Sequence, residues 1–313
     1  MAAIPCGGRV LLGRARSTGL MNYQHHFHAG NHADVLKHLV LLQLIELMQQ
    51  KPGGFLMLDT HAGAGLYDLT ADEARRGDEA RGGIERLRAA MSQTPPSEAP
   101  AMRLISDYLA RVQRFGRTQY PGSPLLAVTQ LRTQDRFVGV ELVSKVAREL
   151  SRHLDLCPRR EAGVALRRTV ARCGEGLAAL KSDLPPIERR GLILIDPPYE
   201  QPHERDDIVA ALEVGLQRFE MGVFALWYPI KQRPYLNRWL NRMARLTDRP
   251  VLTIENSLVP DELGNRLTGS GVLIINPPWQ FDTLIRPALT YLNAALREDT
   301  AAPCAMTWLN PQK

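Results

Sequence analysis

The sequence predicts an α/β fold in which a mostly parallel sheet is covered by helices on both faces. Apolar segments of strand length recur along the chain, and longer segments with helical spacing separate them. Two of the apolar segments run directly into turns rich in glycine or proline, which end a strand. Seven strands are expected, at residues 55–59, 137–141, 165–169, 191–195, 223–227, 251–255 and 271–275.

Helices are predicted between these strands, as a parallel sheet requires. The first is expected at residues 32–50, where apolar residues from Val35 to Ile45 recur at helical spacing and Pro52-Gly53 follows. Further helices are expected at 144–153, 205–218, 233–245 and 281–296, with short ones after Pro124 and at Gly174–Gly176.

Residues 68–117 differ in character from the rest of the chain. They are rich in Arg, Glu and Ala, with Pro95-Pro96 in the middle. Two helices, about 71–92 and 101–115, joined by a proline-rich turn are therefore expected, as a small helical insertion within one domain that spans residues 21–313. The mixed charge of this segment is typical of a solvated helical face.

Composition and charge narrow the class of protein. The 313 residues are 44% hydrophobic, yet no apolar stretch reaches the roughly 18 residues that a membrane span needs, so a cytoplasmic protein is expected. The four cysteines form no Cys-x-x-Cys pair and fit no zinc pattern, so reduced thiols are expected. No segment indicates an obligate protein partner, and we expect a monomer.

The net charge of +6 favours a polyanionic partner only weakly. Residues 1–20 supply half of it through Arg9, Arg14 and Arg16, with no acid. This stretch lacks a continuous apolar core and makes a poor secretory signal. We expect it to be a disordered leader, with Met21 as the natural start.

The most informative segment is the apolar run that ends in Asp196-Pro197-Pro198-Tyr199. The run has the length of a buried strand, and the two prolines cannot extend a sheet. A carboxylate, a rigid turn and an aromatic ring are thereby placed at the carboxyl edge of the sheet, where open α/β folds bind ligands. Such a turn suits a flat base that carries an exocyclic amine.

A second site is predicted after the strand at 55–59, where Gly63 and Gly65 form a short turn. Glycine lets the backbone approach a ligand closely. A nicotinamide dinucleotide is disfavoured, because the third glycine of its motif is absent and no acid follows at the ribose distance. Glu141, which ends the next central strand, can instead bond ribose hydroxyls, and Glu175 can accept from an adenine amine. Without a phosphate-binding lysine, this set favours S-adenosylmethionine.

Several of these segments, taken in order, make the chain similar to the RlmJ family. The run from Tyr23 to His38 followed by LDTHAGAG at 58–65 is the most specific part. The others are residues 121–125, 189–200, 225–229 and 270–279. This family comprises bacterial S-adenosylmethionine-dependent methyltransferases of N6 of one adenine (adenine 2030) in 23S ribosomal RNA. The resemblance implies a Rossmann-like class I methyltransferase fold, that cofactor and that RNA as partner.

The resemblance also implies roles for individual residues. Cofactor contacts are expected from His38, His61, Gly63, Gly65, Ser123, Glu141, Glu175, Gly176 and Asp196. Glu175-Gly176 stands where the family has Asp-Gly. The catalytic motif is Asp196, Pro197 and Tyr199, and the residues expected near the target base are Tyr23, His25, Lys37 and Tyr199.

The Asp196 motif suggests a mechanism. The N6 lone pair of adenine is delocalised into the ring, so it is a poor nucleophile. The Asp196 carboxylate and the Pro197 carbonyl can each accept one N6 hydrogen, which aims the lone pair at the methyl group for direct in-line transfer. Asp196 then accepts a proton as base, and Tyr199 stacks on the extruded adenine.

Two other patterns receive structural interpretations. His28 and His32 have a spacing that a metal could bridge, but Gly30 lies between them, no acidic third ligand is obvious and methyl transfer needs no metal. We therefore expect no metal and interpret the segment as a polar cover, with Lys37 and histidines near phosphates. Asn276-Pro277-Pro278-Trp279 repeats the shape of the catalytic motif, but a neutral Asn cannot act as a base, so we interpret it as a turn.

Two alternatives to the RNA enzyme remain open. A DNA adenine-N6 methyltransferase would carry the same Asp-Pro-Pro-Tyr, although no separate domain for reading duplex DNA is visible. The other alternative is a catalytically silent RNA-binding module. The presence of an intact Asp196, Tyr199 and glycine turn argues against it.

Overall fold

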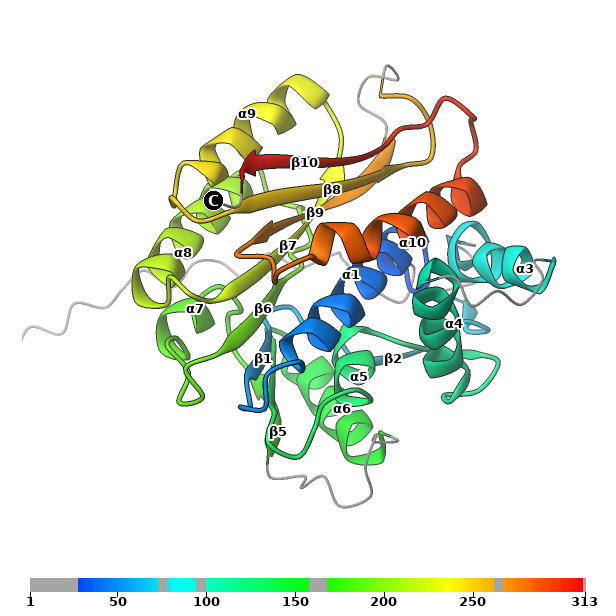
Figure 1. The fold of residues 1–313 in the computed structure, drawn as a ribbon. Coiled ribbons are helices and arrows are strands. Elements are labelled where there is room, and N and C mark those ends of the chain that lie inside the picture. Colours follow the sequence, from blue (N-terminus) through cyan, green and yellow to red (C-terminus); the bar gives the residue numbers. More distant parts are fainter. Residues whose placement is uncertain are drawn as a thin grey trace, which may run out of the picture.

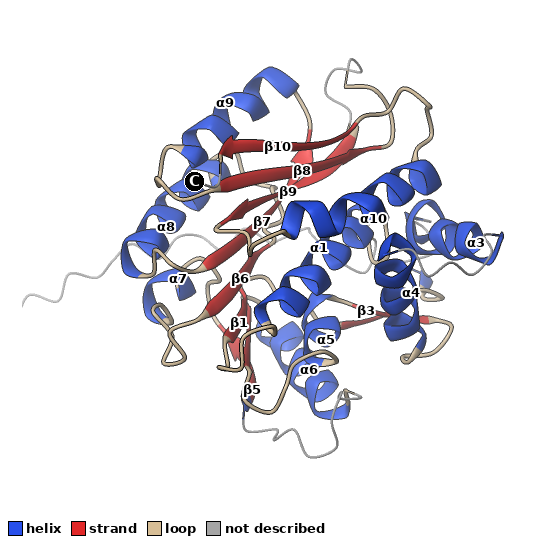
Figure 2. Ribbon diagram, in the orientation of Figure 1, coloured by secondary structure: helices blue, strands red, loops and turns tan. Residues whose placement is uncertain are grey.

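The computed structural model describes residues 28–72, 77, 79–93, 100–157, 168–261 and 267–311. Its centre is an eight-stranded sheet in the order β10-β8-β9-β7-β6-β1-β4-β5 (Figures 1 and 2). The strands are β1 (Leu56–Asp59), β4 (Arg136–Glu141), β5 (Thr169–Cys173), β6 (Gly191–Ile195), β7 (Val223–Ile230), β8 (Val251–Ser257), β9 (Gly269–Ile275) and β10 (Cys304–Asn310).

Strand direction divides the sheet into two parts. From β5 through β4, β1 and β6 to β7, all neighbours are parallel. β9 then runs antiparallel to both β7 and β8, and β10 antiparallel to β8. The carboxyl ends of the five parallel strands therefore lie at one edge of the sheet. This confirms the expected Rossmann-like class I methyltransferase fold.

The predicted count of seven strands is wrong by one, because β10 forms a further edge strand. Its residues are mostly half-exposed, and its pairing with β8 shifts register between Trp308 and Asn310, so no regular alternation marks it in the sequence. The strand expected at 165–169 is displaced to β5. That edge strand is also partly exposed, and Arg172 within it pairs with Asp183.

Helices cover both faces of the sheet (Figure 1). On one face lie α1 (His32–Met48), α5 (Ser123–Val128), α6 (Ser144–Leu156) and α10 (Phe281–Leu296). On the other lie α7 (Ala179–Ser182), α8 (Glu204–Arg218) and α9 (Arg233–Ala244). None of the helices in the described part of the chain is long and apolar enough to cross a membrane.

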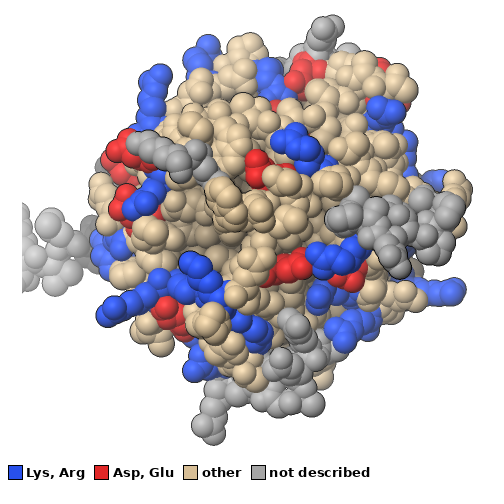
Figure 3. Space-filling model, in the orientation of Figure 1, with Lys and Arg blue, Asp and Glu red and all other residues tan. Residues whose placement is uncertain are grey.

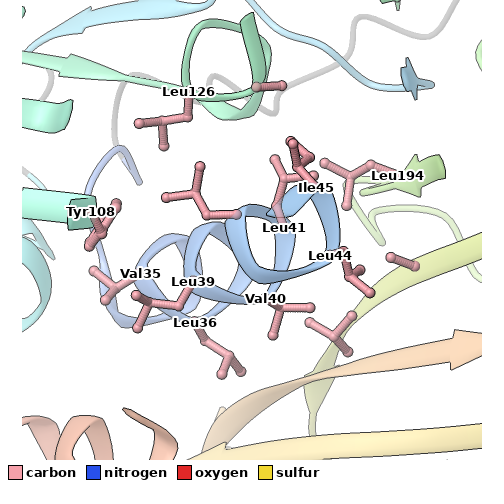
Figure 4. Close-up of a cluster of buried hydrophobic side chains, with 14 of the residues drawn as sticks. Val35, Leu36, Leu39, Val40, Leu41, Leu44, Ile45, Tyr108, Leu126 and Leu194 are labelled. Atoms are coloured by element: carbon pink, nitrogen blue, oxygen red, sulfur yellow. The ribbon is translucent and has the colours of Figure 1, made fainter. Parts of the chain in front are cut away.

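Helix α1 is the best-buried helix of the first face. Its side chains are buried all round except at His32 and Glu46, and they pack between the sheet and the surrounding helices (Figure 4). A helix that is apolar on every side belongs in a core. Its few polar side chains are therefore buried as well, and each of them requires a partner.

The segment 68–117 contains the two expected helices with shifted bounds. They are α3 (Arg86–Gln93), which continues a π-helical turn at Arg81–Glu85, and α4 (Pro100–Gln113). Both pack against α10, outside the layer that contacts the sheet. A two-stranded antiparallel sheet that the sequence did not reveal, β2 (Leu66–Asp68) with β3 (Gln119–Pro121), closes the segment at its base. That the segment is an insertion remains a prediction.

The expected leader at residues 1–20 lies outside the described residues. On the face drawn in Figure 3, lysine and arginine side chains are interspersed with acidic ones. On this face, the distribution of charge therefore gives little indication of a partner-binding surface.

Candidate functional site

The turns that follow β1, β4, β5 and β6 meet at the carboxyl edge of the sheet. Asp59, the last residue of β1, lies between Gly139 of β4 and Leu194 of β6. Just beyond it, the backbone N–H of Thr60 donates to the carbonyl of Leu194, and that of Ala62 to the carbonyl of Val140. The turn after β1 is thereby fixed between the two neighbouring strands.

The glycine turn has the conformation that its sequence requires. Gly63 and Gly65 have φ angles of +58° and +81°, which favour glycine. The N–H of Gly63 donates to Oε2 of Glu141 at 3.1 Å. The N–H of Gly122 donates to the carbonyl of Gly65 at 2.8 Å, which holds the start of α5 beside the turn. Three of the predicted cofactor residues, Gly63, Gly65 and Glu141, therefore lie next to one another.

The turn after β5 lies against the glycine turn. A Cβ atom on Gly176 would come within 1.9 Å of the carbonyl oxygen of Thr60, so only glycine fits there. The Glu175 side chain is exposed, and its two oxygens accept from the N–H groups of Leu177 and Ala178. Each carboxylate oxygen retains a second lone pair for a ligand.

A buried ion cluster lies between α1 and the end of β6. Nζ of Lys37 donates to Oδ1 of Asp34 at 2.8 Å and to Oδ2 of Asp196 at 2.5 Å. The exposed fraction of the side chain is 5% for Lys37, 4% for Asp34 and 15% for Asp196. Asn31 caps α1 by accepting from the N–H of Asp34, and Asp34 in turn accepts from the N–H of Gly30.

Electrostatics keeps the lysine charged in this cluster. Burial alone would lower the pKa of Lys37, but the two carboxylates Asp196 and Asp34 raise it well above its usual value. The expectation that Lys37 lies near phosphates is not supported, since its ammonium is buried and bonded to both aspartates. The expectation that Lys37 acts near the target base remains a prediction, in which Lys37 would act by holding the carboxylate of Asp196.

Asp59 is a site residue that the sequence reasoning missed. Its side chain is fully buried, accepts from the hydroxyl of Ser123 at 2.6 Å and from the N–H of His61 at 3.2 Å. Burial raises the pKa of Asp59 to about 6, the Ser123 hydrogen bond opposes this, and the negative charge of Asp196 adds to it. A signal was available, because Asp59 ends its strand before a turn just as Glu141 does.

The two histidines predicted at the cofactor lie in different surroundings. His38 is fully buried on α1, with Nδ1 2.9 Å from the hydroxyl of Tyr120, whose hydroxyl also bonds that of Tyr108. His61 lies in the glycine turn, with Nδ1 2.8 Å from Oγ1 of Thr60. Burial lowers the pKa of His61 to about 4, although Asp196 opposes the shift. His61 is therefore neutral at pH 7.

Tyr199 is held in a strained and crowded position at the end of the Asp-Pro-Pro-Tyr motif. Its φ angle is +54°, and its hydroxyl donates to the carbonyl of Trp227 at 2.7 Å. The rings of Trp227 and Trp239 meet it edge-on, and the Arg205 guanidinium lies over it, 5.9 Å from the ring centre. Burial raises the pKa of Tyr199 well above its usual value, so it stays neutral.

Tyr23 and His25 lie outside the described residues, so their expected contacts with the target base are untested. His28 bonds Glu79 at 2.9 Å. In the part of the chain that the structure describes, no group of three or more potential ligand side chains could hold a metal ion.

The Asn276 turn lies at the opposite edge of the sheet from Asp196. Its side-chain amide donates to the carbonyls of Glu220 and Gly222, just before β7 begins. This supports its interpretation as a structural turn.

The charge balance of the site fits a cationic ligand without phosphate. Three aspartates, Asp34, Asp59 and Asp196, are coupled to one ammonium, that of Lys37. A phosphate would be repelled by this excess of negative charge, whereas a sulfonium or an ammonium would be attracted. Beside it, the glycine turn and the carboxylates of Glu141 and Glu175 suit a nucleoside, so these residues fit S-adenosylmethionine.

Comparison with known proteins gives consistent matches over nearly the whole chain. A family model described as "Ribosomal RNA large subunit methyltransferase D, RlmJ" matches residues 52–310. Proteins named ribosomal RNA large subunit methyltransferase J from Haemophilus influenzae and Escherichia coli are each 37% identical, over 94% of this chain and 100% of their own length. The crystal structure of protein LPL1258 from Legionella pneumophila is 28% identical, with a TM-score of 0.76 over 90% of this chain and 98% of that one.

The contact between Gly176 and Thr60 predicts a specific loss of stability. In Gly176→Ala the new Cβ would collide with a backbone oxygen, so one of the two turns must move, at a cost of about 1–3 kcal/mol of unfolding free energy. Gly174→Ala is the matched control, because its Cβ would meet nothing nearer than 3.9 Å. Denaturant unfolding should separate the two variants, and equal stabilities would contradict this packing.

Asp59→Asn should stabilise the protein at neutral pH. The raised pKa means that the folded state binds the Asp59 proton more tightly than the unfolded state, so stability falls as the pH rises from about 4 to about 6, and the full cost of ionisation is present above that range. Removing the charge should add roughly 1–3 kcal/mol at pH 7.5, and this gain should shrink steadily towards pH 4. Thermal unfolding at several pH values measures it. The exposed Asp68→Asn should show no such gain, and a gain in Asp59→Asn independent of pH would refute the assignment.

Proposed function

The chain belongs to the RlmJ family of ribosomal RNA large subunit methyltransferases, and on that premise we propose that it transfers a methyl group from S-adenosylmethionine to N6 of one adenine in 23S ribosomal RNA. The observation that supports this reaction most directly is the Lys37–Asp196 ion pair at the carboxyl edge of the sheet. It presents a fixed carboxylate beside the turn that suits the cofactor.

The two oxygens of the Asp196 carboxylate have different roles in this proposal. Its Oδ2 accepts from Lys37, while Oδ1 has no hydrogen-bond partner among the described residues. Oδ1 can accept one N6 hydrogen of an adenine, and the carbonyl of Pro197 can accept the other. The nitrogen lone pair is then turned out of conjugation, and the acceleration arises because the acceptors are already in position, without any covalent step on the protein.

The cofactor, when bound, supplies a methyl group on a positively charged sulfur. As the N6 nitrogen becomes cationic, Asp196 takes its proton. A ring-conjugated ammonium is a far stronger acid than a carboxylic acid, so the carboxylate can take the proton even though Lys37 stabilises its charge. Lys37 also keeps the carboxylate from rotating away, since it is tied to Asp34 on the same helix.

Tyr199 supplies the ring against which the extruded adenine stacks in this proposal. An enzyme that acts on a base removes it from its stack and must replace that stacking. The hydroxyl bond to Trp227 and the edge-on indole rings fix the orientation of the tyrosine ring in advance. Cofactor binding through Glu141, Glu175 and the glycine turn does not involve this ring.

An assay with labelled cofactor tests the reaction and its alternatives. We expect label in protein-free 23S RNA or in an assembled subunit, recovered as N6-methyladenosine after digestion. Label in DNA would support the DNA enzyme, and RNA binding without label would support a silent module. Asp196→Ala and Asp196→Asn should each lower kcat at least 100-fold, while calorimetry still detects cofactor binding, weakened only by the loss of one of the carboxylates that attract the cofactor. Retained turnover would remove Asp196 from the mechanism.

The ring and hydroxyl of Tyr199 can be tested separately. Tyr199→Phe keeps the ring and loses only the bond to Trp227, so we expect activity on RNA within about fivefold of wild type. Tyr199→Ala loses the stacking surface, and kcat/KM for RNA should fall about 10- to 100-fold with little change in cofactor affinity. Equal losses of RNA use and cofactor binding would contradict a stacking role.

A further inference from the structure

A cavity of about 450 Å³ opens beside Tyr199, on the side away from the glycine turn. It lies between the turn that follows β6 and the turn that follows β7, and because these strands are parallel neighbours both turns are at the ligand-binding edge of the sheet. The proposed reaction uses none of its lining residues except Tyr199. Those that matter here are Glu200, Arg205, Lys231 and Tyr235.

Arg205 forms one wall of this cavity and is held by aromatic rings. Its guanidinium carbon lies 5.0 Å from the ring centre of Tyr235 and 5.1 Å from that of Trp239. Trp239 also donates to the backbone carbonyl of Arg205 at 3.1 Å. Nη1 is buried and makes no hydrogen bond, and Arg205 forms no ion pair among the described residues. The positive charge is therefore fixed in place without a carboxylate to neutralise it.

Lys231 and Tyr235 form the open side. Lys231 is exposed, and 46% of Tyr235, near the start of α9, is exposed. The neighbouring Arg233 shows the contrast, since it is bound to both Glu255 and Asp261. Lys231 has no such partner within the described ranges. The cavity thus contains an accessible ring, that of Tyr235, and two cations, Arg205 and Lys231, for which the described residues supply no carboxylate partner.

We propose that this cavity binds the nucleotide next to the target adenine in the RNA strand. Its volume lies in the range of small-ligand sites. A base can stack on Tyr235, and the phosphate that links it to the extruded adenine can lie between Lys231 and Arg205. Glu200, which also lines the cavity, offers a carboxylate that can accept from an exocyclic amine of the base.

The shared wall explains why the two sites would act together. Arg205 lies over the rings of both Tyr199 and Tyr235, so it connects the surface that receives the adenine with the surface that receives its neighbour. Occupying both at once forces the backbone between them to splay, which is the geometry that base extrusion requires. The inference rests on the proposed RNA methyltransferase activity and deepens it.

A double-mutant cycle between protein and RNA tests the stacking part. In short RNA strands that contain the target adenine, the nucleotide on its 5′ or 3′ side is replaced by an abasic one. With the wild-type protein, one of the two replacements should lower kcat/KM about tenfold. With Tyr235→Ala, which itself should lose about tenfold on the intact strand, that same replacement should cost nothing further.

Trp279→Ala is the matched aromatic control. Trp279 is 75% exposed but lies at the opposite edge of the sheet, so its removal should leave the cost of the abasic nucleotide unchanged. If the abasic cost persists undiminished in Tyr235→Ala, or if neither neighbour matters to the wild type, the subsite is refuted.

The phosphate part is tested by salt dependence. Lys231→Ala should reduce the slope of log affinity against log salt for the same RNA by about 0.7, the share of one single-strand phosphate contact. Lys51 is also exposed but lies before β1 at the far edge of the sheet, so Lys51→Ala should leave the slope unchanged. Equal slopes for the two variants would overturn the phosphate contact.

These experiments separate the subsite from the reaction itself. If the wild-type protein methylates no RNA at all, the proposed function fails. If it methylates RNA and the Tyr235 and Lys231 variants behave like their controls, only the subsite fails. Unchanged cofactor affinity in both variants is required for either conclusion, and loss of that affinity would show that the cavity supports the fold instead.

Discussion

The site depends on one buried ammonium group, that of Lys37. It bonds Asp34 on its own helix and also Asp196 at the end of β6, which lies 159 positions further along the chain. A buried charge without a partner is costly, and breaking a buried pair by removing one member typically costs about 3–5 kcal/mol. The three groups are therefore stable only together, and their pairing fixes the position of α1 relative to the end of β6.

The same cluster sets the chemical preference of the site. Burial and the neighbouring Asp196 raise the pKa of Asp59, which means that the folded protein bears the cost of concentrating negative charge there. Perturbed acids of this kind gather where ligands bind. A cationic cofactor would recover part of that cost on binding, while the neutral His61 beside it adds no competing positive charge.

Topology explains why cofactor and RNA would approach from different sides. From β1 the strand order runs through β4 to β5 in one direction and through β6 to β7 in the other. Ligands of such sheets bind where the order reverses. The turns after β1, β4 and β5 carry the glycines and the acids suited to a nucleoside. The turns after β6 and β7 carry the aromatic rings and cations suited to a nucleic-acid strand, with Asp196 at the boundary between the two groups.

The sequence by itself determined the α/β class, the strands β1, β4, β6 and β7, the glycine turn and the Asp196 motif, because strand length, helical spacing and strand-ending turns are properties of a few neighbouring residues. It did not determine β10 or the displacement of β5, since half-exposed edge strands are defined by the partner they pair with. Nor did it give the role of Asp59 or the true place of Lys37. Only the tertiary structure decided those, because burial and a distant opposite charge, not the local sequence, fix the ionisation and the bonding of a side chain.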